Sequence, residues 1–136
     1  MNTTTQYRLG KKDKLKSRKQ INALFASGKK INHFPVRAIW MPSSSNHSLQ
    51  VGFSVSSRHF KRAVDRNRIK RLMRESYRLQ KNELEILLKN TEKKIVLFLN
   101  YTGKDLPLFS DLYNTCGLVL QSLINNLHKI PASNIQ

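Results

Sequence analysis

Residues 58–81 read RHFKRAVDRNRIKRLMRESYRLQK. Ten of these residues are Arg or Lys, and only Asp65 and Glu75 are acidic. At about 100° per residue, a set of mostly apolar side chains falls on one helical face. The pattern predicts a helix from about Ala63 to Lys81, which could extend through Leu88, with one face buried in a domain and cations on the rest of its surface. The predicted buried face consists of Ile69, Leu72, Met73, Ser76 and Leu79.

Cations recur one helical turn apart on the side away from that face. Like charges at this spacing repel, and Glu75 is the one acid of the helix expected to pair, with Arg71 or Arg78. A cationic row with so few carboxylates favours a role in binding a phosphate backbone over a solvated face, since Arg makes bidentate phosphate contacts and Lys adds a point charge. Asn67 either takes part in binding or only caps or fills a turn. The row consists of Arg66, Lys70, Arg74 and Arg78, with Asn67 and Arg71 alongside.

The composition of the whole chain points in the same direction. Its 136 residues include 25 Lys and Arg against 8 Asp and Glu, a formal net charge of +17. Such a charge attracts a polyanion, and nucleic acid is favoured over an anionic membrane surface. No apolar run approaches the roughly 18 residues of a spanning helix, and the N-terminus lacks the apolar stretch of a secretory signal. The single Cys116 cannot form an internal disulfide, so a cytoplasmic location is expected.

Periodicity along the rest of the chain predicts one RNA-binding domain over residues 17–130, after a basic flexible arm (1–16) and before a tail (131–136). A short helix is expected from Ser17 to Gly28, and an amphipathic helix from Phe109 to before Pro131, with Cys116 in the core. Strands are expected at 31–41, where Pro35 suggests an edge position, at 49–56, and at 95–99, where the run IVLFL is apolar on both faces. The order αββαβα, or αβββαβα with one more short strand, predicts an α+β fold, a compact sandwich of a small mixed sheet and about three helices.

Side chains suited to catalysis are scattered. The eight acids form no pair with the spacing of a general acid–base set, and the four His residues show no metal-ligand spacing. We therefore expect no catalytic side chain and no metal site in the protein itself. The residues concerned are Asp13, Asp65, Glu75, Glu83, Glu85, Glu92, Asp105 and Asp111, with His33, His47, His59 and His128.

A second candidate surface comes from strand alternation. Arg37, Ile39 and Ser54 should project from the sheet face opposite Val51, Phe53 and Val55. If the basic helix packs beside that face, the two form a groove suited to single-stranded nucleic acid, with cations on one wall and apolar groups on the floor. Phe25 either extends the floor or packs in the core. Tyr77 is expected to flank the cations, and Trp40 and Phe53 to lie in the core.

The run VGFSVSSRHFKRAVDRNRIKRLMRESYR (51–78) resembles the signature of the bacterial ribonuclease P protein component. The Arg-Asn-Arg motif of that family stands at residues 66–68, followed by Ile-Lys-Arg at 69–71 and Arg-Glu at 74–75. The upstream segment LKSRKQINALFASGKK (15–30) and the later IVLFLNY (95–101) also match, so the resemblance spans about residues 14–128.

The resemblance implies a protein subunit of a ribonucleoprotein endoribonuclease whose RNA carries the catalytic centre and removes the 5′ leader of precursor tRNA with Mg²⁺. The protein would bind that RNA and the leader, and help the RNA and substrate hold the metal ions, without a membrane or an obligate protein partner. A left-handed β-α-β crossover around the basic helix is also implied. Expected contacts with the catalytic RNA are Arg58, Lys61, Arg62, Arg66, Asn67, Arg68, Lys70, Arg71 and Arg74; expected leader-cleft residues are Phe25, Arg37, Ile39 and Ser54.

This chain departs from the family pattern at three positions. Ile39 and Ile21 stand where the family often has aromatic residues, which weakens stacking there, and Ser57 stands where a Lys is usual, which removes a phosphate contact.

Two other classes of protein fit parts of the pattern. A general RNA-binding or ribosome-associated protein would share the charge but would not need Asn67, and a stand-alone metal-dependent nuclease would cleave without an RNA subunit.

Overall fold

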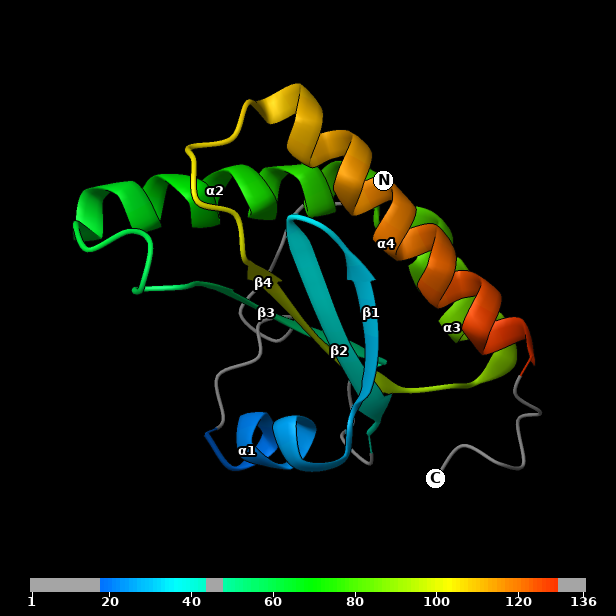
Figure 1. Ribbon diagram of the computed structural model, residues 1–136. Coiled ribbons are helices and arrows are strands. Elements are labelled where there is room, and N and C mark those ends of the chain that lie inside the picture. Colours follow the sequence, from blue (N-terminus) through cyan, green and yellow to red (C-terminus); the bar gives the residue numbers. More distant parts are fainter. Residues whose placement is uncertain (1–17, 44–47, 130–136) are drawn as a thin grey trace, which may run out of the picture.

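The computed structural model describes residues 18–43 and 48–129 (Figure 1). The predicted arm (1–16) and tail (131–136) lie outside these residues. The fold is α+β, as predicted, with the element order αβββααβα. The elements are α1 (Arg18–Ser27), β1 (Lys29–His33), β2 (Val36–Pro42), β3 (Leu49–Val55), α2 (Ala63–Gln80), α3 (Asn82–Thr91), β4 (Ile95–Tyr101) and α4 (Phe109–Lys129).

The four strands form one mixed sheet in the order β1-β2-β4-β3. β2 pairs antiparallel with β1 and with β4, whereas β3 and β4 run parallel. Parallel neighbours need a crossover connection, and here the chain passes from β3 through α2 and α3 before it returns as β4. β4 is therefore an internal strand with both of its edges hydrogen-bonded, which fits its run of apolar residues.

Helices cover the two faces of the sheet unequally. Side chains of α2, α3 and α4 share one large buried cluster with the inner face, which includes Trp40, Val51 and Leu97. Among the described residues, the outer face packs against α1 through a smaller cluster of Leu24, Ile39, Val96 and Phe98, with Ile21 and Met41 at its margin. Figure 1 shows α1 on the side of the sheet away from the other three helices. β4 is thus buried on both faces, as predicted.

The segment predicted as one strand (31–41) is a hairpin of two strands. The chain turns at Phe34 and Pro35, which are joined by a cis peptide bond, and Phe34 is exposed at the turn. Pro35 therefore lies between strands and not within one, and β2 is an internal strand while β1 forms the edge. The inner-facing positions change from odd (Ile31) to even (Val36, Ala38 and Trp40) at the turn, but the first arm has only one buried inner residue, so the alternation gave too weak a signal of the reversal.

The basic helix also differs in detail from its prediction. It ends at Gln80, and α3 follows after the single residue Lys81, so the domain has four helices where about three were expected. Ile69, Met73 and Ser76 are buried as predicted, but Leu79 is 37% exposed and Tyr77 is buried, at 1%. The buried face is turned toward Tyr77 because α2 packs against β3 as well as α4. The prediction that Tyr77 flanks the cations was wrong.

Candidate nucleic-acid interface

The buried face of α2 fixes the direction of its other side chains. Ile69, Met73 and Tyr77 pack in the main core, and the Tyr77 ring meets Phe53 edge-on with centroids 5.8 Å apart. The buried Ser76 hydroxyl is satisfied because it donates to the Leu72 carbonyl at 2.9 Å. With this face anchored, the remaining faces of the helix must project away from the core.

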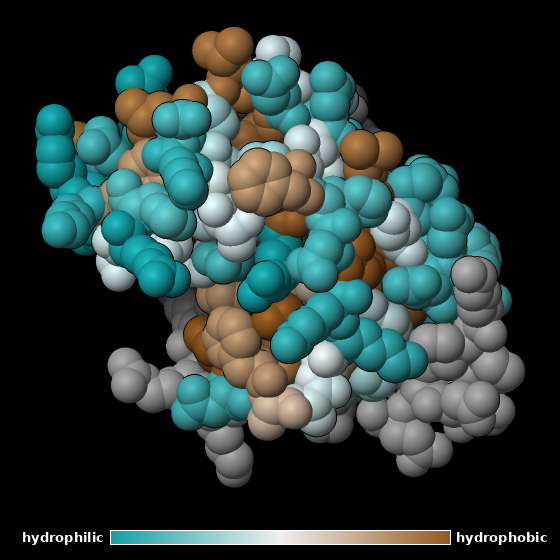
Figure 2. Space-filling view, viewed as in Figure 1, coloured by the Kyte–Doolittle hydropathy of each residue, from teal (hydrophilic) through white to brown (hydrophobic). Residues whose placement is uncertain are grey.

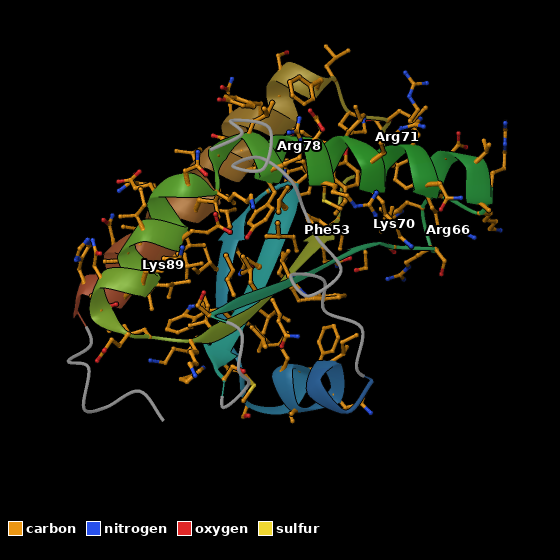
Figure 3. All side chains as sticks on the ribbon, turned by 180° about the vertical axis from the view of Figure 1, so that it is seen from behind. Phe53, Arg66, Lys70, Arg71, Arg78 and Lys89 are labelled. Atoms are coloured by element: carbon orange, nitrogen blue, oxygen red, sulfur yellow. The ribbon has the colours of Figure 1, made fainter. Side chains whose placement is uncertain are left out.

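Those faces carry cations whose charge is not neutralised nearby. Arg68, Arg71 and Arg74 are exposed and Lys70 is half-buried, and Arg58 and Lys61 are exposed in the segment before the helix. Within residues 18–43 and 48–129, none of these six side chains makes an ion pair. Hydrophilic side chains gather over the first turns of α2 in Figure 2, and Figure 3 shows Lys70 on the same side of α2 as Phe53, and Arg71 on the other side.

Arg66 differs from the other cations of the motif. Its Nη1 donates to the carbonyls of Phe60 and Lys61, at 2.7 and 2.8 Å, and the side chain is half-buried. Phe60 is itself buried, with its ring 6.0 Å from that of Tyr101. Arg66 therefore holds the β3–α2 connection against the first turn of the helix and, in doing so, sets the position of the exposed Arg58 and Lys61.

Two other arginines in this region have carboxylate partners. Arg78 donates to Glu75 through Nε, at 3.1 Å, and through Nη2, and the hydrogen bond from Arg78 lowers the pKa of Glu75, outweighing the effect of its burial. Arg62 lies 3.7 Å from Asp65 in an exposed pair. Glu75 thus pairs with Arg78, one of the two partners that the sequence allowed, and this pair neutralises the last cation of the row.

Arg74 has an aromatic neighbour. Its guanidinium carbon lies 5.7 Å from the centroid of the Phe53 ring, within the range of a cation–π contact. Phe53 packs against the core as predicted but is only half-buried. The contact orients Arg74 while leaving its side chain exposed.

Asn67 lies in the second turn of α2, and its side chain is exposed. The residue at the N-cap is Arg62, which makes no side-chain capping bond. Asn67 therefore does not cap the helix, and its amide is presented to solvent among the cations of residues 66–71. Capping of this helix is thus excluded for Asn67, and its role in binding stays a prediction.

The outer face of the sheet brings together two of the four predicted cleft residues. Arg37 on β2 and Ser54 on β3 are both in register with Asn100 of β4. Ser54 Oγ donates to Asn100 Oδ1 at 2.6 Å, and Arg37 Nε donates to Asn32 Oδ1 at 3.2 Å. These four side chains, from all four strands, form what we call the polar row. Asn100 and Asn32 were missed, although Asn100 continues the alternation of Val96 and Phe98 on the outer face.

Phe25 and Ile39, the other two predicted cleft residues, differ in their exposure to solvent. Phe25 on α1 is 52% exposed, and its ring meets that of Phe98 edge-on with centroids 5.3 Å apart. Ile39 is 3% exposed and packs beneath α1 with Leu24 and Phe98. Ile39 therefore cannot form an open cleft floor, because α1 covers this part of the outer face. Phe25 supplies the exposed aromatic surface instead.

The basic helix does not stand beside the outer face. Its buried residues share a cluster with Val51 and Val55, so α2 covers the inner face. The predicted groove with α2 as one wall is wrong, and the cations of α2 and the polar row lie on different sides of the sheet. α1 is the helix that borders the polar row.

The described residues do not form a metal site or a membrane span. In ranges 18–43 and 48–129, no three His, Cys, Asp or Glu side chains are close enough to hold a metal ion. Among the same residues, no helix is both long and apolar enough to cross a membrane. Cys116 is buried as predicted, and burial raises the pKa of its thiol to about 12, which suppresses the reactive thiolate.

Comparisons with known proteins agree with this geometry. The family model for ribonuclease P matches residues 9–110. A ribonuclease P protein component from Porphyromonas gingivalis (strain ATCC 33277) is 30% identical over 138 residues, which cover 100% of this chain and 98% of that protein. A ribonuclease P protein component from Chlorobium phaeobacteroides is 40% identical over 81 residues, 56% of each chain.

Solved structures show the same fold. The ribonuclease P protein of Staphylococcus aureus superposes with a TM-score of 0.63 at 17% identity, over 82% of this chain and 94% of that one. A mutant of that protein gives a TM-score of 0.65 at 19% identity, over 90% and 98%. The family match covers most of the chain, and the match to the relative from P. gingivalis covers this whole chain and 98% of that protein. This chain is a member of the bacterial ribonuclease P protein component family, and thus part of a ribonucleoprotein that matures the 5′ end of tRNA.

Proposed function

We propose that this protein uses two surfaces for two RNAs. The cations of α2 and the segment before it bind the ribonuclease P RNA, and the outer face of the sheet binds the 5′ leader of precursor tRNA. The observation that carries the proposal is the set of six cations around α2 that have no ion pair within the described residues. Such charges repel one another in the free protein, and a phosphate backbone relieves that repulsion.

The geometry of the cations supports a fixed footprint. Met73 and Tyr77 anchor α2 from behind, and Arg66 holds the preceding segment, so Arg58, Lys61 and Arg71 keep defined positions. Side chains that are already oriented lose less conformational freedom on binding than flexible ones. The protein would therefore recognise the shape of its RNA as well as its charge.

The outer face suits a single strand. Phe25 presents a half-exposed ring for base stacking, and Arg37 adds a cation within the polar row. A leader bound here would be held to the protein while the adjacent tRNA lies on the catalytic RNA. The protein would thereby raise the affinity for the substrate, and no protein side chain would make or break a covalent bond.

The proposal assigns Mg²⁺ to the RNA subunit and the substrate. The described acids do not converge on one point, so they do not fit a protein-held metal ion. The protein can favour Mg²⁺ binding only by holding RNA and substrate phosphates in place. This assistance should matter most when Mg²⁺ is scarce.

Reconstitution tests the proposal. The full chain is combined with ribonuclease P RNA at low Mg²⁺, and 5′ processing of a precursor tRNA is measured with and without protein. A large gain in processing is expected, and no gain would reject the proposal. Lys89→Ala serves as a matched control, because Lys89 is exposed on α3, far from the labelled cations of α2 in Figure 3, and should leave the gain unchanged.

Asn67→Ala separates a specific subunit from a general RNA-binding protein. The exposed amide makes no capping bond, so its loss should leave the free energy of unfolding within about 0.5 kcal/mol of the wild type. We expect processing by the reconstituted enzyme to fall more than affinity for unrelated RNA. Equal loss in both assays would favour the general RNA-binding class.

A further inference from the structure

Asn100 is the one side chain that links the two halves of the polar row. It lies on β4, in register with Arg37 on one side and with Ser54 on the other. It follows Phe98 by two residues, so both side chains project from the outer face. Asn100 is half-buried, so it is accessible but restricted.

The hydrogen bond from Ser54 decides which end of the Asn100 amide a ligand would meet. An Asn side chain has a carbonyl that accepts and an NH₂ group that donates. Ser54 Oγ donates to the carbonyl oxygen, Oδ1, at 2.6 Å. The NH₂ group is therefore the part left to face a ligand.

Arg37 strengthens this preference for acceptors. A guanidinium has only donors, and the Arg37 Nε is already used by Asn32 Oδ1 at 3.2 Å, which orients the group. A ligand on the middle of the row thus meets an amide NH₂ and a guanidinium side by side. Both groups favour a ligand edge that carries hydrogen-bond acceptors.

Nucleobases differ in this property. Uracil and guanine carry a carbonyl at the position where cytosine and adenine carry an amino group. A base that stacks on the half-exposed Phe25 ring, which itself contacts Phe98, would lie near the residue two positions along β4. Its carbonyl could then accept from Asn100, whereas an amino group would meet donors only.

We propose that Asn100, oriented by Ser54 and flanked by Arg37, selects keto bases over amino bases in a single RNA strand bound to the outer face. The identity of that strand as the 5′ leader rests on the proposed function. The base selectivity rests only on the polar row and on the ring of Phe25.

Binding of labelled oligouridine and oligocytidine of equal length to the full chain tests the selectivity by fluorescence anisotropy. The wild type should bind oligouridine about two- to tenfold more tightly, the range of one net hydrogen bond. Equal affinities would overturn the inference. Because this comparison uses the unaltered protein, it does not depend on whether any variant folds.

Two variants assign the selectivity to the amide. Asn100→Asp places an acceptor where the NH₂ group stood, so it should weaken both complexes and remove or reverse the preference. Asn114→Asp, at an exposed position on α4, makes the same change in charge and should keep the wild-type preference. Ser54→Ala leaves the amide free to rotate and should bring the two affinities together. A full preference in both Asn100→Asp and Ser54→Ala would overturn the assignment.

The two proposals fail in different ways. The oligonucleotide assay contains no ribonuclease P RNA, so a base preference without any gain in processing would reject the proposed function alone. A gain in processing with no base preference would reject the inference alone. In the reconstituted enzyme, replacing leader uridines one at a time by cytidine should slow processing at one or two positions and not uniformly.

Discussion

The two surfaces proposed to meet RNA differ in how their polar side chains are held. On α2, the cations are oriented by the packing of the opposite face, and most have no carboxylate partner among the described residues. On the outer face, all four members of the polar row are hydrogen-bonded in pairs, Arg37 with Asn32 and Ser54 with Asn100. Unpaired charge favours affinity for any phosphate backbone, whereas side chains hydrogen-bonded to one another present a chosen donor or acceptor and favour selectivity.

The largest expected effect tests the boundary of the proposed binding surface on the outer face. Ile39→Ala removes a side chain buried beneath α1 and should lower the free energy of unfolding by about 2–4 kcal/mol, through lost burial and the cavity left behind. Chemical denaturation measures this change. If the variant instead kept its stability and lost leader binding, Ile39 would belong to the open surface and the boundary drawn here would be wrong.

A smaller effect is expected at Arg66, whose guanidinium donates to backbone carbonyls of its own chain. Arg66→Lys keeps the charge but cannot reproduce the fork that bonds Phe60 and Lys61. We expect a loss of about 1–2 kcal/mol in the free energy of unfolding. Arg71→Lys, at an exposed position, should change stability by less than about 0.5 kcal/mol. Equal losses in the two variants would show that Arg66 has no special structural role.

Salt dependence separates the two surfaces by charge. Each phosphate contact contributes a slope of about −0.7 to log K against log[salt] for a single strand. Lys70→Ala should make the slope for ribonuclease P RNA shallower by about one contact, and Asn100→Ala should leave it unchanged. The slopes are measured by titrating RNA at several salt concentrations. An unchanged slope for Lys70→Ala would remove Lys70 from the footprint.

The smallest effect concerns the paired end of the cationic row. Glu75→Gln removes a negative charge and releases Arg78 from its carboxylate. RNA affinity should rise by about twofold, and the salt slope should steepen by at most about one contact. Binding to RNA at low salt measures the change. A loss of affinity would mean that the pair holds α2 in its binding conformation.

The same pair has a defined pH dependence. Because the pKa of Glu75 is lowered in the folded protein, the pair stabilises the fold above the unfolded-state value of 4.5 and loses this contribution as the pH falls through the folded-state pKa. The side chain of Glu75 is 44% exposed, so solvent screening keeps the effect small. Glu75→Gln should abolish this part of the acid dependence of unfolding.

Much of the fold and part of the site followed from the residues alone. The period of 3.6 in residues 63–80 predicted a helix with Ile69 and Met73 buried, and the run IVLFL predicted a strand covered on both faces. The hairpin at Phe34 and Pro35 and the division at Lys81 were not predicted. The strand alternation changes phase at the hairpin, but Ile31 alone marks the inner face of the first arm, and helical periodicity continues across Lys81. Of the four expected cleft residues, Arg37, Ser54 and Phe25 reach the outer surface, and Ile39 does not.

The sequence by itself determined the class of partner. The chain has a formal net charge of +17, and part of this charge lies on a helix whose other face is apolar, which favours a polyanionic partner whatever the topology. Only the tertiary structure decided which side chains could reach that partner, because strand order and register are long-range properties. They placed Asn100 between Arg37 and Ser54, buried Ile39 under α1, and turned Arg66 toward the backbone of its own chain.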